Sequence, residues 1–449
     1  MVPMKFLKRF LVLLVIIICI VFTYNYPKLN ILAGYSAKNT ASSVFLANRS
    51  LKYTDNNDNN FSPINLTSDK INTEEKSATG SVFGLLTRKA IFRKGLGAVL
   101  ITNDYDSQQK NLVPKRALVN NTTPFPYGNA PQKDTLFKNI DYQKLNKAID
   151  ILFSEENKTR ATVVVYKNHI IAERYADSLH KDSKLLGWSM TKSITSTLFG
   201  ILQCQGKINV YDKAPIEEWK NDDRKHITIH NLLQMNSGLE WIEDYNTISD
   251  VTKMLFLEKD MTKSQIKKPF VGKPNQSWNY SSGTTNLLSG ILRNQFTTHQ
   301  EYLDFWYSAL IDKIGMNSML IETDMSGNFV GSSYAWATPR DWAKLGLLYL
   351  HNGEWNGEHL FDKDWVTYAT TPTPTSNTTT DGGYGAQIWL NTGNKYPDAP
   401  KNMFSFNGYK GQNVFILPDQ DLVIVRMSLT KNADVNQFLK DILTSITYE

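Results

Sequence analysis

The two ends of residues 136–449 carry mirrored patterns, and this arrangement restricts the possible folds strongly. An amphipathic helical pattern begins after Asp141 and precedes two strand-like runs, and near the other end two strand-like runs precede a final helical pattern. The strand-like runs cover residues 162–166, 170–175, 414–417 and 422–427, and the final helical pattern covers 435–446. This order is typical of an antiparallel sheet that carries the terminal helices on one face. Residues 226–368 are largely helical in pattern, so we predict an α+β fold: an antiparallel sheet flanked by terminal helices, with a mostly helical subdomain.

The stretch Gly-Trp-Ser-Met-Thr-Lys-Ser at 187–193 carries the first candidate for chemistry, because Ser189 and Lys192 are three residues apart. On a helix this spacing puts two side chains on one face, about 5–6 Å apart at Cβ. Burial and the positive end of a helix lower the pKa of a lysine, so a neutral amine could accept the proton of the serine hydroxyl. Ser189 would then be a nucleophile and Lys192 its base. The alternative is a helix cap beside a surface lysine.

The same Ser-x-x-Lys spacing occurs at four other serines, so the surrounding sequence must distinguish them. The rivals are Ser107, Ser178, Ser264 and Ser428. Ser189 is the one followed by an apolar stripe at helical spacing, from Ile194 to Leu202, with Gly206 beyond it as a candidate helix end. We therefore expect Ser189 at the start of a buried helix, where the helix dipole favours developing negative charge.

Two later stretches supply further candidate residues. Tyr280 lies in Trp-Asn-Tyr-Ser-Ser-Gly at 278–283, and a phenol near a nucleophile can relay a proton; a buried tyrosine in a turn is the alternative. The stretch Asn-Gly-Tyr-Lys-Gly-Gln at 407–412 precedes a strand, and its glycines would let the backbone approach a ligand. An N–H group there could stabilise an oxyanion, whereas an ordinary glycine-rich start of a strand is the alternative.

Charge, histidine and cysteine content argue against several other classes of function. The net charge of +6 is spread thinly, and no Lys/Arg block interleaves with aromatic residues, so nucleic-acid binding has little support. Cys19 and Cys204 are not expected to form a disulfide. His226 and His230 are four residues apart, but Thr228 between them resembles a helix cap, so structure is a better interpretation than a metal site.

The N-terminus resembles an export signal. Lys5, Lys8 and Arg9 precede an almost uninterrupted apolar run at 10–24, and no small-x-small cleavage site follows it closely. We therefore favour an uncleaved membrane anchor over a cleaved signal peptide; in both cases the remainder of the chain would be exported. The predicted division is an N-terminal signal at 1–24, an extension at 25–135 whose polar segment 55–79 is expected to be loop or linker, and a main domain at 136–449.

Taken together, these stretches resemble the serine β-lactamase and penicillin-recognising superfamily, in its class C-like branch. That branch includes esterases, D-aminopeptidases and 6-aminohexanoate-dimer hydrolases. The matching residues are 187–193, 232–238, 280–283, 337–341 and 408–412, in the expected order. The resemblance implies a β-lactamase/transpeptidase-like fold that needs no metal or organic cofactor.

The resemblance also implies a role for each candidate residue. Ser189 attacks a carbonyl, Lys192 takes its proton, and Tyr280 relays a proton to the leaving group. The backbone N–H groups of Ser189 and Gln412 form an oxyanion hole, and the substrate lies beside the residues of the third motif, Tyr409, Lys410 and Gly411.

Two departures from the family pattern limit the substrate. Tyr409 stands where related enzymes often have a cationic residue, and Tyr-Ser-Ser at 280–282 replaces the Tyr-x-Asn of β-lactamases. Both weaken a penicillin-hydrolysing interpretation and leave a serine hydrolase for small esters or linear amides. The alternatives are a D-amino-acid peptidase or weak β-lactamase acting on cell-wall material, and a membrane-tethered binding or sensor protein without catalysis. The sequence predicts no oligomeric state.

Overall fold

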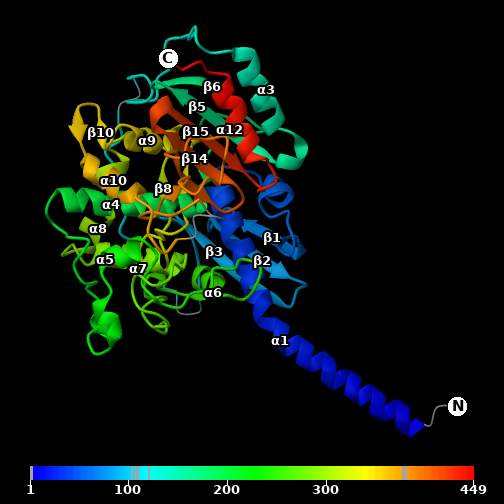
Figure 1. Cartoon of the computed structure of the whole chain (residues 1–449). Coiled ribbons are helices and arrows are strands. Elements are labelled where there is room, and N and C mark those ends of the chain that lie inside the picture. The colour runs from blue at the N-terminus through cyan, green and yellow to red at the C-terminus, as the bar shows by residue number, and fades with distance from the viewer. Residues whose placement is uncertain (1–3, 103–104, 107–110, 120–121, 377–381, 449) are drawn as a thin grey trace. The chain divides into compact units, whose positions relative to one another are not determined.

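The structure is a computed structural model that describes residues 4–102, 105–106, 111–119, 122–376 and 382–448 (Figure 1). Contacts divide the chain into two compact units. The first comprises residues up to 92 with 98–106 and 242–259, and the second comprises 93–97, 107–241 and 260–449. Ser107 and the first three residues lie outside the described residues. The boundaries expected after residues 24 and 135 stay predictions.

The first unit contains the long helix α1 (Met4–Phe45) and a four-stranded sheet in the order β1-β2-β3-β4. The strands are β1 (Thr67–Asn72), β2 (Ser77–Val82), β3 (Leu86–Arg93) and β4 (Gly97–Leu100), and the helices α2 (Leu51–Tyr53) and α6 (Asp250–Leu257) complete the unit. Small residues let helix and sheet approach closely: a Cβ on Gly80 would lie 2.7 Å from the carbonyl oxygen of Ala33. The loop expected at 55–79 is therefore wrong where β1 and β2 form, because polar strands can pair when small residues on their inner face pack against a helix.

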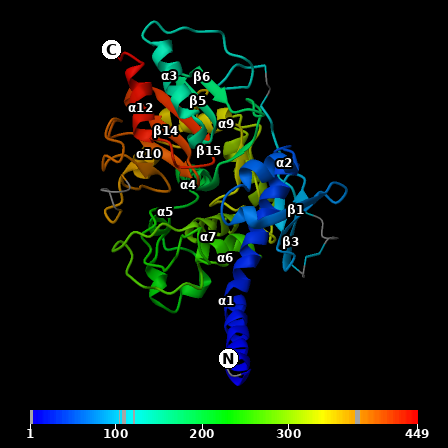
Figure 2. The ribbon, with the colours of Figure 1, turned by 90° about the vertical axis from the view of Figure 1, so that its right-hand side faces the viewer.

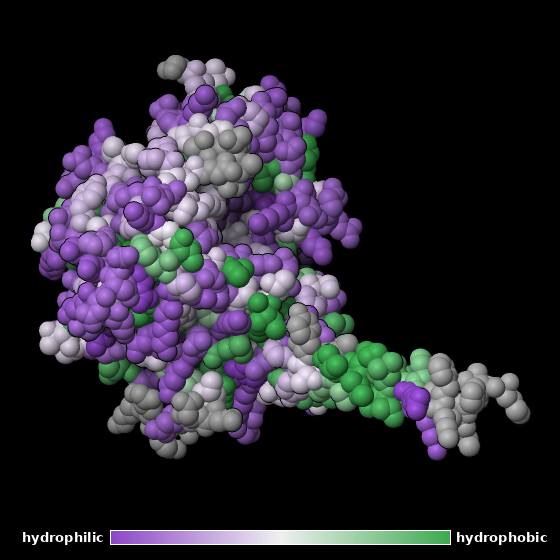
Figure 3. Space-filling view, turned by 60° about the horizontal axis from the view of Figure 1, so that its bottom comes forward, coloured by the Kyte–Doolittle hydropathy of each residue, from purple (hydrophilic) through white to green (hydrophobic). Residues whose placement is uncertain are grey.

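Between residues 10 and 22 of α1, the described large apolar side chains are exposed. Figure 3 shows this hydrophobic surface of the helix. From Ile31 onward most side chains of this helix are buried or half-buried. Among the helices that the structure describes, none has both the length and the apolar character of a membrane span.

The second unit contains a six-stranded sheet in the order β12-β13-β14-β15-β5-β6, and every neighbouring pair is antiparallel. The strands are β5 (Thr159–Tyr166), β6 (His169–Tyr175), β12 (Trp389–Leu390), β13 (Phe404–Gly408), β14 (Gln412–Leu417) and β15 (Leu422–Ser428). Side chains alternate between the two faces of the sheet: Val164 packs with the terminal helices α3 (Tyr142–Leu152) and α12 (Val435–Thr444), which lie together in Figure 2, while Val163 packs in the other core, which contains α9 (Pro339–Leu350). The predicted α+β fold, with terminal helices on one face of an antiparallel sheet, is confirmed.

The helical part of the second unit surrounds α4 (Thr191–Cys204), whose residues from Thr191 to Leu202 are all buried. The surrounding elements are α5 (Ile229–Leu233), α7 (Ser282–Arg293), α8 (His299–Trp306), α10 (Lys363–Thr370) and a small sheet of β7 (Leu185–Leu186), β9 (Ala335–Ala337) and β8 (Leu320–Ile321). A helix without a solvent face must satisfy its polar side chains internally. Accordingly, Thr195 Oγ1 donates to the carbonyl of Gly331 (3.0 Å) and Ser196 Oγ donates to that of Ala386 (2.8 Å).

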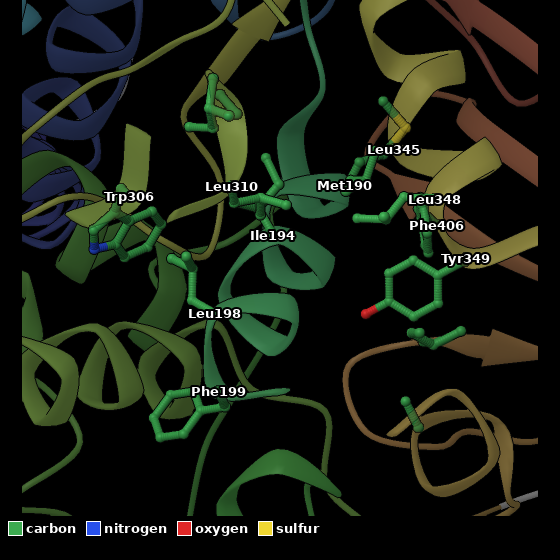
Figure 4. Close-up of a cluster of buried hydrophobic side chains, with 14 of the residues drawn as sticks. Met190, Ile194, Leu198, Phe199, Trp306, Leu310, Leu345, Leu348, Tyr349 and Phe406 are labelled. Carbon is green, nitrogen blue, oxygen red and sulfur yellow. The ribbon is translucent and has the colours of Figure 1, made fainter. Parts of the chain in front are cut away.

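Leu198 lies on α4 among Ile194, Trp306 and Leu310, and it is fully buried (Figure 4). We expect Leu198→Ala to lower the free energy of unfolding by about 2–5 kcal/mol, because the cavity left behind adds to the lost burial. Urea denaturation monitored by tryptophan fluorescence would measure this loss. Ile151→Ala is the control: Ile151 is 53% exposed, so its truncation should change stability by less than about 0.5 kcal/mol. Equal effects of the two variants would contradict this account of the core.

Candidate active site

Ser189 lies in the 3₁₀ turn η4 (Trp188–Met190), which leads directly into α4. Trp188 has φ of +49°, in the left-handed region that a bulky residue rarely adopts, so the backbone beside Ser189 is strained. Thr191 Oγ1 fixes this turn by donating to the carbonyl of Trp188 (2.7 Å) and accepting from the N–H of Ala335 on β9 (3.1 Å). The turn thus holds a half-buried hydroxyl at the N-terminal end of a buried helix.

The amine of Lys192 is almost completely buried, at 1% exposure, and lies within hydrogen-bond distance of three oxygen atoms. Its Nζ is 3.1 Å from Ser189 Oγ, 2.9 Å from Ser282 Oγ and 3.0 Å from the carbonyl oxygen of Ser332. A neutral amine has two N–H donors and one lone pair, so it could donate to Ser282 and Ser332 while accepting the hydroxyl proton of Ser189. The geometry suits a base as well as an ammonium group.

The other Ser-x-x-Lys pairs do not show this arrangement. Among the described residues, none of the pairs that begin at Ser178, Ser264 and Ser428 is hydrogen-bonded, and Ser428 Oγ donates instead to the carbonyl of Asn157 (2.9 Å). Of the four pairs that lie in the described residues, the pair of Ser189 and Lys192 is therefore the one whose side chains are within hydrogen-bond distance of each other.

Tyr280 directly precedes α7, whose N-cap is Ser281. The Nζ atom of Lys192 is 4.9 Å from the centre of the Tyr280 ring. Aromatic neighbours hold that ring, among them Trp389 at 5.3 Å between centroids and Tyr384 at 5.9 Å and nearly perpendicular. The structure therefore brings Ser189, Lys192 and Tyr280 together from α4 and the start of α7.

The turn at 409–411 joins β13 to β14 beside the serine. A Cβ on Gly408 would lie 2.1 Å from the carbonyl oxygen of Gly187, so only glycine allows this approach of the two backbones. The Tyr409 ring stands edge-on to Trp188 at 5.6 Å, and Lys410 Nζ is 5.7 Å from the centre of the Tyr409 ring. Gly411 is buried at the end of the turn.

Gln412 is buried at the start of β14, where it pairs with Gly408 across the hairpin. Its side chain lies between the turn and β15, since Nε2 donates to the carbonyl of Ser428 (2.6 Å) and Oε1 accepts from the N–H of Ser428 (3.1 Å).

Three residues that complete this arrangement were not predicted from the sequence. Ser282 supplies an acceptor for Lys192, and Ser332 supplies a backbone carbonyl, which no side-chain pattern reveals. Gln387 links three helices: its carbonyl accepts from Ser193 Oγ (3.0 Å), its Oε1 accepts from Thr285 Oγ1 (2.7 Å), and its Nε2 donates to the carbonyl of Leu233 (2.8 Å). Ser282 was detectable as part of the 280–283 stretch, whereas Ser332 and Gln387 depend on the tertiary fold.

The histidine pair has a structural explanation. Thr228 is the N-cap of α5, as expected, and His230 Nδ1 is 3.0 Å from the hydroxyl of Tyr368. Burial lowers the pKa of His230, so its ring is neutral at pH 7. Within the described ranges, no group of three or more His, Cys, Asp or Glu side chains is placed to hold a metal ion.

Comparison with known proteins places this arrangement in a family. The family model described as Beta-lactamase matches residues 155–443. The 6-aminohexanoate-dimer hydrolase of Paenarthrobacter ureafaciens is 23% identical over 312 residues, which cover 63% of this chain and 76% of that protein.

Two solved structures share the fold. A family VIII carboxylesterase superposes with a TM-score of 0.55 at 13% identity, covering 68% of this chain and 97% of the esterase. A penicillin-binding protein homologue from Caulobacter crescentus also gives a TM-score of 0.55, at 14% identity, with coverage of 68% and 97%. The predicted β-lactamase/transpeptidase-like fold is confirmed.

We expect Ser282→Ala to slow labelling of Ser189 by a fluorophosphonate about tenfold to a hundredfold, because Lys192 Nζ loses one of its three oxygen neighbours. Gel fluorescence against time measures the labelling rate. Ser196→Ala is the matched control, since it removes a buried serine hydroxyl from α4 that donates to Ala386 and not to Lys192. Equal labelling rates in the two variants would show that Ser282 has no part in the reactivity of Ser189.

Proposed function

This chain belongs to the beta-lactamase family and is a serine hydrolase, and from that premise we propose that Ser189, Lys192 and Tyr280 cleave an ester or linear amide through an acyl-enzyme. The observation that carries the proposal is the distance of 3.1 Å between Lys192 Nζ and Ser189 Oγ. A nucleophile within hydrogen-bond reach of a positioned base is the arrangement that covalent catalysis requires.

In the acylation step, Ser189 Oγ attacks the carbonyl carbon of the substrate while its proton passes to the lone pair of Lys192 Nζ. The carbonyl oxygen takes the electron pair of the broken π bond and becomes an oxyanion. Ser282 Oγ and the Ser332 carbonyl, at 2.9 and 3.0 Å, then accept hydrogen bonds from the ammonium group that forms.

Collapse of the tetrahedral intermediate expels the alcohol or amine, which must receive a proton. We propose that the Tyr280 hydroxyl donates this proton and is then reprotonated by Lys192. The supporting observation is the distance of 4.9 Å between Lys192 Nζ and the centre of the Tyr280 ring. Water then attacks the acyl carbon and passes its proton through Tyr280 to Lys192. The bond from that carbon to Ser189 Oγ breaks, Lys192 returns the proton to Oγ, and the acid is released.

For the oxyanion we propose the backbone N–H groups of Ser189 and Gln412 as donors. The N–H of Tyr409 is a second candidate for the latter role, since Gly408, directly before it, lies against Gly187. Backbone donors fixed before the reaction lower the barrier without reorganisation. Which of the two N–H groups faces the oxyanion does not alter the roles of Ser189, Lys192 and Tyr280.

We propose a small neutral ester or a linear amide as the substrate class. The curated relative is named for a linear amide, 6-aminohexanoate dimer. Tyr409 presents an aromatic ring beside Trp188 where a cation would hold a substrate carboxylate. The D-amino-acid peptidase or weak β-lactamase function, and the non-catalytic sensor, remain the competing functions, and the same experiment separates them.

With p-nitrophenyl acetate, we expect a burst of product followed by slower turnover, because acylation precedes deacylation. Ser189→Ala should lower kcat by at least about 10⁴-fold and remove the burst. Lys192→Ala should lower it nearly as much, since base and nucleophile act as one unit, and Tyr280→Phe should lower it by about 10²–10³-fold. Stopped-flow absorbance measures both phases.

Ser178→Ala is the control, because Ser178 has the same Ser-x-x-Lys spacing without the hydrogen bond, and it should keep the full burst. Unchanged turnover in Ser189→Ala would refute the assignment. Durable labelling of Ser189 by fluorescent penicillin, with no turnover of 6-aminohexanoate dimer or esters, would favour the cell-wall alternative. The absence of any adduct with a fluorophosphonate would favour the sensor.

We also propose that the catalytic unit is exported, because basic residues at 5–9 precede an apolar run at 10–24. Alkaline phosphatase, which is active only outside the bacterial cytoplasm, fused after residue 135 should be active when residues 1–24 are present. Deletion of residues 1–24 should abolish that activity. Equal phosphatase activity per fusion molecule with and without the segment would contradict export.

A further inference from the structure

Two buried side chains donate hydrogen bonds to the turn at 409–411, and together they reach all three of its carbonyl oxygens. Gln412 Nε2 donates to the carbonyl oxygens of Tyr409 (3.0 Å) and Lys410 (3.4 Å). Arg426 Nη1 donates to the carbonyl oxygen of Gly411 (3.2 Å). Tyr409 contacts Trp188 and Gly408 contacts Gly187, so the position of the turn determines where its backbone N–H groups lie relative to Ser189.

Gly411 is required for the contact with Arg426. Its φ is +80°, and a Cβ there would lie 2.3 Å from Arg426 Nη1 and 2.6 Å from the carbonyl oxygen of Thr430. Any other residue would be strained and would displace the guanidinium group. Gly411 therefore leaves the space that the guanidinium group of Arg426 occupies beside the turn.

Arg426 is an unusual residue for the centre of a sheet. It lies on β15 with 0% exposure, and its Nη2 donates to Ser428 Oγ (3.1 Å) and to the carbonyl of Thr430 (3.3 Å). Among the residues that the structure describes, no carboxylate pairs with it, and its Nε has no hydrogen-bond partner. Burial lowers the pKa of Arg426 to about 10, so the side chain remains a cation at neutral pH.

A buried charge without an anionic partner is destabilising, and neutral residues of similar volume usually pack better. If the role were purely structural, a neutral amide could donate to the Gly411 carbonyl, as the Gln412 side chain does to the carbonyls of Tyr409 and Lys410. A permanent cation differs in one respect: it polarises the Gly411 carbonyl, which shares a peptide group with the Gln412 N–H proposed as an oxyanion donor.

We propose that Arg426 is a positioning residue that fixes the 409–411 turn and polarises the peptide group between Gly411 and Gln412, so that its N–H better stabilises the oxyanion formed on the substrate carbon bonded to Ser189 Oγ. This inference rests on the acyl-enzyme chemistry proposed above. The Gly411 carbonyl and the Gln412 N–H belong to one peptide group, and hydrogen bonding of a carbonyl to a cation strengthens its N–H as a donor. If the N–H of Tyr409 is the donor instead, Arg426 acts by holding the turn that begins at that residue.

The test compares the transition state with the ground state in Arg426→Met and Arg426→Lys. In Arg426→Met, we expect kcat for p-nitrophenyl acetate to fall roughly tenfold to a hundredfold with KM little changed, since direct removal of one oxyanion donor has an effect of 10²–10³. The inhibition constant of phenylboronic acid, which forms an anionic tetrahedral adduct with Ser189 Oγ, should rise by a similar factor. Arg426→Lys keeps the charge and should recover part of both losses.

Arg340→Met is the matched control. It removes a guanidinium group that donates to Glu173 Oε2 (2.8 Å) on β6, at the opposite edge of the sheet from β12 and β13. Both methionine variants should lower the melting temperature, but kcat and the boronic acid inhibition constant should change in the Arg426 variant alone. If Arg426→Met does not fold, Arg426→Gln, which also removes the charge but keeps an amide donor, carries the same comparison of kcat with boronic acid affinity.

Unchanged kcat and unchanged boronic acid affinity in a folded variant that lacks the positive charge would overturn the proposal and leave Arg426 a structural residue. Failure of the underlying chemistry has a different signature, because turnover would then survive in Ser189→Ala. A loss of kcat that is matched by a parallel rise in KM, with boronic acid binding intact, would also overturn the role in oxyanion stabilisation.

Discussion

The arrangement around Ser189 depends on a buried amine that is surrounded by oxygen atoms. Lys192 Nζ lies within 3.1 Å of Ser189 Oγ, Ser282 Oγ and the Ser332 carbonyl, which come from three separate parts of the chain. An amine removed from water needs such partners, because burying an unsatisfied polar group is costly. The elements that deliver these oxygen atoms must therefore be held rigidly, and much of the second unit can be understood as the means of holding them.

The burial of α4 from Thr191 to Leu202 suits that requirement. A helix with a solvent face can shift and fray, whereas this part of α4 is enclosed, and its Thr and Ser side chains are bonded to backbone carbonyls of neighbouring segments such as Gly331 and Gln387. The same loop that accepts from Thr195 at Gly331 presents the Ser332 carbonyl to Lys192 one residue later. The hydrogen bonds that stabilise the helix thus also set the distance between the base and its acceptors.

Local spacing and periodicity were enough to predict four strands of the sheet, the terminal helices and the pairing of Ser189 with Lys192, because each depends on residues close together in the chain. The strands β12 and β13 were not predicted. The failures share a cause. The polar strands β1 and β2 form because small residues such as Gly80 and Ala78 pack on α1, and composition alone indicated a loop. Ser332 contributes only its backbone, and Arg426 lies in an ordinary strand pattern, so their roles appear only when distant segments meet.

The two buried basic residues, Lys192 and Arg426, have different chemistry, and each suits its position. Lysine can lose its proton when buried, which a base that cycles between amine and ammonium must do, whereas arginine keeps its charge and presents a rigid fork of donors. Lys192 touches Ser189 directly, while Arg426 reaches the site through the Gly411 carbonyl. An exchange would fail at both places: a guanidinium at 192 could not accept a proton, and an amine at 426 could titrate and would lose the geometry that bonds Gly411, Ser428 and Thr430 together.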